Sequence, residues 1–517
     1  MTNNSSRSYN LLRNVTATLI AQVVILLISF VNRTIFIKLL GAEYLGIDGL
    51  FGSILTVLSL AELGLGSAII FNLYKPIADG DTEKAKQYIS FYAKAYNTII
   101  AVVLAAGLLL LPFLKLIINS DDIKVNVNLY AVYLLFLVNT VSSYFLAHRQ
   151  AVLVVNQRQS TVSAVQMSVK IAALTAESVI LLVFGNYYLY LASKVIANYI
   201  QAVIISILAK RKYPDLCVKS QNRLSKNELS VVKKNVSALF IRRIGSIVLS
   251  STDNLIINGF ISTVMVGVYS NYTLIVSSVQ TVTVQLFSAM TATIGNYVAS
   301  KKKENVEKLF RVYTYAIYLV YGFCCICLYT LTNRFILLLW GKEYLLSELT
   351  LLIIVVNFFF YGFQAAVNVF RDTTGLFVQG KYRVLISAAV NVIFSLLLVK
   401  PLGISGVILA TVVSRVAVSA WFDPFILYRH YFKGAVSGYY IRVLLYTAVT
   451  LALCLLSDFL SGFFGFGIIG FLAAAFVSVL CSGLLLLPFI RTKESKELFE
   501  RSRDILGKII SKVNNKA

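Results

Sequence analysis

Charged side chains interrupt several long apolar runs of this sequence, and they are the residues that could do chemistry. The stretch from Ser237 to Phe260, SALFIRRIGSIVLSSTDNLIINGF, holds Arg242, Arg243 and Asp253 in an otherwise apolar segment. Charges are costly inside a bilayer, and those that occur there usually face a cavity or one another and mark ion or substrate pathways. A cationic cavity suits an anionic ligand, and the planar fork of arginine matches phosphate in particular.

Similar residues recur in other apolar runs. We predict that six cations line a polar cavity and bind an anionic substrate: Arg33, Lys170, Lys194, Arg242, Arg243 and Arg415. Three carboxylates are candidates for ion coupling, namely Glu62, Asp253 and Glu177. With Asp423 the acids in these runs number four, so the cations are in excess.

Glu62 lies in LSLAELGLGSAI, near the middle of an apolar span at 46–73. A carboxylate at that depth carries a proton, holds a cation or pairs with a base. The flanking Gly64 and Gly66 allow the backbone to approach a neighbour closely or the helix to bend. The structural alternative to an ion-coupling role is a buried ion pair.

Spacing along the predicted helices suggests pairs among the other charges. Lys170 and Glu177 lie seven residues apart on one face, and Lys194 reaches a similar depth after a short turn. A Glu177–Lys194 pair would leave Lys170 to act on a ligand. Arg415 and Asp423 are eight residues apart on roughly one face, which makes Asp423 the candidate partner of Arg415.

The adjacent Arg242 and Arg243 cannot aim at the same point, because neighbouring side chains on a helix point about 100° apart. We expect one of them to face the cavity and the other to reach towards the lipid headgroups.

The elements that position these residues are membrane helices. The chain is 58% hydrophobic and only 14% charged, and about 14 apolar spans follow one another between residues 15 and 490. This pattern predicts an all-α polytopic membrane protein and excludes a soluble enzyme with one anchor. Lys and Arg gather in alternate loops, such as AKRKYPDLCVKSQNRLSKNELSVVKKN, and in the tail from Arg491. The positive-inside rule then places both termini in the cytoplasm.

Several other classes of protein lack support in the sequence. The formal charge of +24 is explained by topology, so nucleic acid is not an expected partner. His148 and His430 are far apart, and the six cysteines do not form a disulfide pattern, so no metal is expected. No G-x-x-x-x-G-K-[ST] loop is present. No cofactor is therefore expected, while coupling to protons or sodium is left open.

A shift of 221 residues superimposes two parts of the chain, with Gly46 on Gly267 and Glu83 on Glu304. The shift spans six helices, an even number, which indicates a parallel repeat of the kind found in transporters that rock one half against the other. We predict an N-lobe at 1–209, a basic cytoplasmic linker at 210–234, a C-lobe at 235–432, two appended spans at 433–490 and a basic cytoplasmic tail at 491–517.

Residues 36–81, FIKLLGAEYLGIDGLFGSILTVLSLAELGLGSAIIFNLYKPIADGD, resemble the first two spans of bacterial polysaccharide-biosynthesis flippases. These are the Wzx-type proteins of the multidrug/oligosaccharidyl-lipid/polysaccharide exporter superfamily. The later segments STDNLIINGF, LWGKEYL and LGISGVILATVVS are similar to landmarks of the same group, and the likeness runs over nearly the whole chain.

The resemblance implies a non-enzymatic flippase in the bacterial plasma (inner) membrane, with two six-helix lobes around a cavity that alternates between the membrane faces. Its implied cargo is an oligosaccharide repeat unit on undecaprenyl pyrophosphate, moved to the external leaflet for capsule, exopolysaccharide or O-antigen synthesis. Its implied partners are that lipid-linked cargo and the membrane lipids, with a polysaccharide polymerase and chain-length machinery as candidates.

Three alternatives stay open at this level. A lipid II flippase has 14 spans and a cationic cavity as well, and the sequence does not decide the cargo. An ion-coupled drug exporter of the same superfamily would be expected to have an acidic, aromatic cavity. A membrane polysaccharide polymerase or glycosyltransferase would need a catalytic external loop, and the longest external segments, near 331–348 and 119–127, are short.

Overall fold

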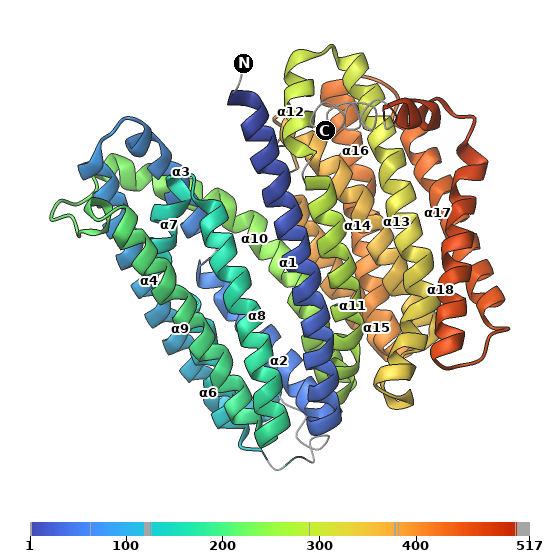
Figure 1. Cartoon of the computed structure of the whole chain (residues 1–517), viewed down its shortest axis with the longest axis horizontal. Coiled ribbons are helices and arrows are strands. Elements are labelled where there is room, and N and C mark those ends of the chain that lie inside the picture. Colours follow the sequence, from blue (N-terminus) through green and yellow to red (C-terminus); the bar gives the residue numbers. More distant parts are fainter. Residues whose placement is uncertain are drawn as a thin grey trace, which may run out of the picture. The chain divides into compact units, whose positions relative to one another are not determined.

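The computed structural model of the chain describes residues 3–62, 64–117, 125, 127–288, 290–376, 379–380, 382–501 and 503. The side chains of residues 3–19 and 241–243 are among those that lie outside this description. Everything regular in the described part is helical, which confirms the predicted all-α class. The chain divides into two compact units, Met1–Ser270 (unit 1) and Asn271–Ala517 (unit 2). Figure 1 shows the long helices of both units.

Unit 1 contains mostly long helices joined by short turns. Its elements are α1 (Asn3–Leu40), α2 (Ala42–Leu58), the 3₁₀ turn η1 (Ser59–Glu62), α3 (Leu65–Ala78), α4 (Thr82–Leu110), η2 (Leu111–Phe113), α5 (Leu114–Ile117), α6 (Leu129–Ser142), α7 (Ala147–Val155), α8 (Gln159–Phe184), α9 (Tyr187–Lys212), η4 (Asp215–Cys217), α10 (Lys226–Phe260) and the start of α11 (Thr263–Ser288). Within it α8 packs on α1 and α9, and α2 packs on α10.

Unit 2 continues α11 and adds a second bundle. Its elements are α12 (Thr291–Ser300), α13 (Lys303–Leu339), η5 (Lys342–Tyr344), α14 (Glu348–Thr373), α15 (Arg383–Ser414), the π-helix η6 (Arg415–Ala420), α16 (Trp421–Leu427), the π-helix η7 (Tyr428–Phe432), α17 (Ser437–Ser461), α18 (Ile468–Gly483) and η8 (Leu484–Phe489). The long α13 is central, because α14, α17 and α18 all pack against it (Figure 1).

In the described part of the chain, 11 helices are long and apolar enough to cross a membrane. One of them, Arg383–Phe432, is 50 residues long. It contains two of the predicted spans, separated by a kink at Gly403, whose φ of 56° is non-helical. The predicted span 46–73 is divided between α2 and α3, and the stretch from Ser237 to Phe260 forms the second part of α10. The chain is a multi-pass membrane protein.

The repeat-related Gly46 and Gly267 lie in contact inside unit 1. A Cβ atom on Gly46 would come within 2.1 Å of the Thr263 carbonyl oxygen, and one on Gly267 would come within 2.7 Å of the Gly46 nitrogen. Small residues allow membrane helices to approach at backbone distance. The glycine pair therefore permits the close packing of α2 against the start of α11.

The two appended helices α17 and α18 are joined to α13 by polar contacts as well as by packing. The Thr330 hydroxyl donates to Ser457 Oγ over 2.9 Å, and the Tyr318 hydroxyl donates to the Leu485 carbonyl over 3.0 Å. The rings of Tyr318 and Tyr446 stack with centroids 4.2 Å apart. Hydrogen bonds of this kind hold membrane helices together where no difference in hydrophobicity drives them to associate.

Candidate substrate and ion sites

The first candidate site surrounds Glu62, at the point where the second predicted span breaks. Helix α2 ends at Leu58, η1 continues to Glu62, and Gly64 has a left-handed backbone with a φ of 81° before α3 begins. Only glycine adopts this conformation without steric cost. The sequence suggested that these two glycines allow either a bend or a close approach, and both occur. The helix is interrupted at Gly64, and the backbone at Gly66 lies close to two tyrosine hydroxyls.

The Glu62 carboxylate accepts a hydrogen bond from a tyrosine that is packed beside a second tyrosine. Tyr96 donates a hydrogen bond to Glu62 Oε1, and the rings of Tyr92 and Tyr96 lie 4.6 Å apart. A Cβ atom on Gly66 would stand 2.6 Å from the Tyr96 hydroxyl and 2.7 Å from that of Tyr92, so a larger residue would push both away. Among the described residues no base forms an ion pair with Glu62. A carboxylate held by neutral donors in a broken helix can take up a proton or a small cation.

The second candidate site is a cavity of about 160 Å³ lined by residues of α6, α8 and α9. Three of the predicted residues, Lys170, Glu177 and Lys194, line this one cavity, together with Asn139, Asn198 and Gln201. Glu177 is 3% exposed. In the described part of the chain neither Glu177 nor Lys170 makes an ion pair or a side-chain hydrogen bond. The cavity is therefore lined by one acid, two bases and three amides, of which the Asn198 amide already donates to Asn139 Oδ1 over 3.0 Å.

The predicted Glu177–Lys194 pair is wrong. Lys194 Nζ lies 3.5 Å from Asp48 Oδ1, and it also lies 4.3 Å from the centroid of the Tyr190 ring. The Tyr187 hydroxyl donates to the same Asp48 oxygen over 3.5 Å. Asp48 comes from α2, which brings a closer carboxylate than the one on α8. The expectation that Lys170 is left without a partner holds for the described residues.

Other predicted residues of unit 1 lie at polar helix contacts. Arg33 donates to the Ser270 hydroxyl, and the neighbouring Asn32 donates to Ser178 Oγ over 3.1 Å. Asp253 is 7% exposed on α10, and the adjacent Asn254 donates to Ser53 Oγ over 2.9 Å. These polar side chains therefore lie at contacts between packed helices.

The side chains of Arg242 and Arg243 lie outside the described residues, although the backbone of α10 passes through both positions. Which of the two arginines faces a cavity stays a prediction.

The third candidate site, in unit 2, is Arg415. Its Nε donates to Asn357 Oδ1 over 2.9 Å, an Nη donates to Gln364, and its guanidinium lies 5.4 Å from the centroid of the Tyr361 ring. These three partners share one face of α14. Arg415 is the first residue of the π-helix η6, and such helices occur frequently at functional sites. No carboxylate among the described residues forms an ion pair with Arg415.

The predicted Arg415–Asp423 pair is wrong as well. Asp423 is 1% exposed and forms ion pairs with Arg371 of α14 and Arg383 of α15. Arg371 also donates to the Leu376 carbonyl over 3.2 Å. The π-helical residues 415–420 change the helical register between Arg415 and Asp423, so a count made for a regular α-helix does not place them on one face.

Sequence reasoning missed three charged residues that the structure shows to be partners, Asp48, Arg371 and Arg383. Asp48 had a recognisable signal, because it interrupts an apolar run between Gly46 and Gly49. The two arginines lie at the ends of apolar spans, where basic residues usually indicate topology alone. Among the described residues no group of three or more His, Cys, Asp or Glu side chains could hold a metal ion.

The fold is that of the multidrug and lipid flippase transporters of the MOP superfamily. It is similar to the lipid II flippase MurJ in its inward closed conformation, with a TM-score of 0.66, 16% identity, and coverage of 93% of this chain and 99% of that one. It is also similar to an inward-facing multidrug resistance MATE family transporter of the MOP superfamily (TM-score 0.62, 13% identity, 78% and 94% coverage). A third likeness is to the Vibrio cholerae MATE transporter VcmN in its bent form (TM-score 0.53, 15% identity, 83% and 98% coverage).

The sequence places the chain within one family of this class. The family described as "Polysaccharide biosynthesis protein" matches residues 11–294, more than half of the chain. The protein belongs to that polysaccharide biosynthesis family. No curated protein matches the sequence.

Proposed function

We propose that the protein flips undecaprenyl-pyrophosphate-linked oligosaccharide repeat units from the cytoplasmic to the external leaflet of the bacterial plasma membrane. The cargo would serve capsule, exopolysaccharide or O-antigen synthesis. The predicted lobes at 1–209 and 235–432 would move against each other, so that a polar cavity opens to one face at a time. Family membership and the transporter fold support this proposal, and they favour transport over catalysis.

The observation that carries the proposal is the environment of Arg415. A guanidinium within an apolar helix is expensive unless its charge is compensated, and its described partners, Asn357, Gln364 and Tyr361, are all neutral. These partners orient the fork and leave its positive charge available to an anion. Pyrophosphate would supply the missing negative charge and could accept two parallel hydrogen bonds.

Lys170 would add positive charge in unit 1, with Lys194, whose charge is shared with Asp48, as a second contact, and the amides beside them would bind sugar hydroxyls. Arg33, Arg242 and Arg243 stay in the proposal as further cationic contacts along the route of the cargo.

Glu62 is the proposed ion-coupling residue, with Glu177 and Asp253 as further candidates. A neutral hydroxyl donor, an interrupted helix and a half-buried carboxylate are a combination that can bind and release a proton or sodium ion as the surroundings change. Glu62→Gln keeps the shape and hydrogen-bonding capacity of the side chain but removes its ability to ionise. We expect this variant to lose the dependence of transport on an imposed proton or sodium gradient while cargo binding persists.

The test is complementation in a bacterium that lacks its own repeat-unit flippase, with lipid-linked sugar measured separately in each leaflet. The wild-type chain should move sugar-linked lipid outwards, and Arg415→Gln should reduce that movement. Arg429→Gln, a change at an exposed arginine of η7, is the matched control. Absence of outward movement with the wild-type chain would refute the proposal, whereas rescue of a strain lacking its lipid II flippase would assign the cargo to that alternative.

A further inference from the structure

Unit 2 contains a cavity of about 500 Å³ that the proposed function does not use. It lies where α13 ends, α14 begins and α17 ends, so it opens at one end of three membrane helices. That level corresponds to the lipid headgroups, and the charge distribution predicts that it faces outwards. The volume is within the usual range for a small-molecule site.

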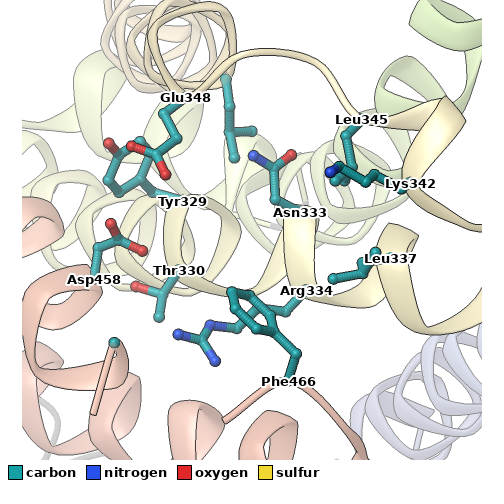
Figure 2. Close-up of a pocket in the computed structure, with 12 residues that line it drawn as sticks. Tyr329, Thr330, Asn333, Arg334, Leu337, Lys342, Leu345, Glu348, Asp458 and Phe466 are labelled. Atoms are coloured by element: carbon teal, nitrogen blue, oxygen red, sulfur yellow. The ribbon is translucent and has the colours of Figure 1, made fainter. Parts of the chain in front are cut away.

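Two acids and two bases line this cavity, Glu348 and Asp458 together with Arg334 and Lys342. Figure 2 shows the two carboxylates on one side, around Tyr329, and the Lys342 ammonium on the opposite side beside Asn333. No ion pair joins any two of these four side chains among the described residues. The Arg334 guanidinium lies beside Thr330, nearer to Asp458 than Lys342 is (Figure 2). The cavity therefore presents charges of both signs that form no ion pair with one another, which leaves room for a ligand that carries both signs.

Arg334 is fixed in place by the loop between α17 and α18. Its guanidinium donates to the Ser461 carbonyl over 2.7 Å and to the Phe464 carbonyl over 3.3 Å, and it lies 5.3 Å from the centroid of the Phe466 ring (Figure 2). These two hydrogen bonds use part of a group that has five N–H donors. The remaining N–H donors of Arg334 are held in one orientation before a ligand binds. Binding therefore costs less side-chain entropy than it would for a mobile arginine.

The loop beside the cavity is strongly apolar. Phe463 is 74% exposed, Phe466 is 78% exposed, and Phe459 on the last turns of α17 is 67% exposed. Aromatic side chains at the ends of membrane helices lie among the headgroups and the upper acyl chains. A ligand in this cavity therefore has a charged recess for its polar end and an apolar surface for an attached hydrocarbon chain.

We propose that this cavity binds the headgroup of a zwitterionic phospholipid that carries a phosphate and a primary ammonium, such as phosphatidylethanolamine. Arg334 and Lys342 bind the phosphate, Glu348 and Asp458 accept hydrogen bonds from the ammonium, and the acyl chains lie along the exposed face of α17. An anionic headgroup without an ammonium would leave both carboxylates facing negative charge, and a neutral sugar would neutralise none of the four groups. The site does not depend on the identity of the flipped cargo.

The test is lipid binding to the purified full-length chain in detergent, measured by native mass spectrometry with phosphatidylethanolamine, phosphatidylglycerol and phosphatidylcholine of matched acyl chains. The wild type should bind phosphatidylethanolamine about tenfold more tightly than phosphatidylglycerol, because charge-assisted hydrogen bonds to the ammonium are added. Phosphatidylcholine should also bind more weakly, since its quaternary ammonium donates no hydrogen bond.

Variants on each side of the cavity separate the two contacts. Asp458→Asn should remove the preference for phosphatidylethanolamine over phosphatidylglycerol, whereas Lys342→Gln should weaken both lipids. Glu348→Gln, at an exposed position, is a second acid variant in case Asp458→Asn folds poorly. Asp372→Asn and Lys400→Gln are matched controls at exposed positions outside the cavity. Equal binding of the two lipids by the wild type, or an unchanged preference in both acid variants, would overturn the proposal.

Discussion

Arg415 and Asp423 lie only eight residues apart in unit 2, yet their surroundings differ completely. The buried Asp423 carboxylate has two arginine partners, Arg371 and Arg383. The Arg415 guanidinium has an asparagine, a glutamine and a tyrosine ring. One charge is compensated within the protein, and the other is oriented without being compensated.

This difference is the one expected between a charge that stabilises the fold and a charge that binds a ligand. A buried charge whose partners carry the opposite sign is satisfied before any ligand arrives, and its loss leaves those partners exposed to an apolar interior. A charge that is held only by neutral groups is not neutralised by the protein, so a ligand or ion of opposite charge can still bind to it. Unit 1 contains the same contrast, since Lys194 is paired with Asp48 whereas Glu62 is held by the hydroxyl of Tyr96.

The largest effect is expected from Asp423→Asn. This change leaves Arg371 and Arg383 without their counter-charge in a buried position, which typically costs about 3–5 kcal/mol. We expect a large fall in unfolding temperature in detergent and a loss of folded protein from the membrane. The exposed Asp372→Asn, on the same α14 that carries Arg371, should leave stability unchanged. If Asp423→Asn were as stable as the wild type, the ion cluster would not be structural.

Arg415→Gln should give the opposite pattern. If Arg415 binds the pyrophosphate as proposed, its removal deletes charge-assisted hydrogen bonds worth about 1.5–3 kcal/mol, so transport should fall about 10- to 100-fold. Stability should change little or rise, because an uncompensated charge leaves the membrane interior. Arg415→Lys keeps the charge without the fork and should restore only part of the transport. Transport assays and thermal unfolding of the same preparations check the expected fall in transport and the expected stability. An Arg415→Gln variant that is destabilised but binds cargo normally would show that Arg415 is a structural charge.

Asp48→Asn tests the paired charge of unit 1 in a less buried setting. The side chains of Lys194 and Asp48 are 23% and 25% exposed, so solvent screens part of the lost attraction. We expect a loss of about 1–2 kcal/mol in the free energy of unfolding, smaller than for Asp423. Lys194→Gln should produce a similar loss, and the double variant should cost less than the sum of the two. Strictly additive losses would show that the two side chains do not interact.

The smallest effect is expected from a pair that lies outside the apolar spans, at the start of α10. Glu228 Oε1 lies 2.5 Å from Lys84 Nζ. Glu228 also forms a capping box with Ser225 at the start of α10. Burial raises the pKa of the Glu228 carboxyl, but hydrogen bonds from Lys84 and Ser225 outweigh it, so the pKa is lowered. A surface pair of this kind contributes less than about 1 kcal/mol.

The lowered pKa determines the pH at which that contribution disappears. A carboxyl whose pKa falls on folding stabilises the protein above its ordinary pKa, and the stabilisation is lost as the pH falls through the lowered value. Glu228→Gln should therefore unfold at a slightly lower temperature than the wild type at neutral pH, and the two should converge in acid. A difference that persists at low pH would mean that packing, and not charge, is responsible.

Much of the fold could be predicted because the bilayer limits the choices of the chain. Long apolar runs must form helices that satisfy their own backbone groups, so the class and the approximate position of most spans follow from hydropathy. The span 46–73 is an exception, because it is divided between α2 and α3. The two glycines beside Glu62 also indicated a local irregularity correctly, since glycine tolerates the left-handed backbone that Gly64 adopts. The repeat identified Gly46 and Gly267 as equivalent, and the structure places them in contact.

The pairing of the charges could not be predicted in the same way. Spacing along one helix suggested Glu177 for Lys194 and Asp423 for Arg415, but the true partners come from other helices. A π-helix between Arg415 and Asp423 changes the register on which that spacing depended. The spacing of residues along one helix does not show which other helix packs against it, or which face that helix presents.

By itself, the sequence determined that this protein is a helical membrane protein with a surplus of cations in its apolar spans, because hydropathy and charge are properties of single residues and short runs. Only the tertiary structure decided which of those charges are neutralised and which remain available. Compensation requires oppositely charged atoms within a few ångströms. That proximity is produced by the packing of helices distant in sequence, as when α2 supplies Asp48 to Lys194 and α14 supplies Arg371 to Asp423.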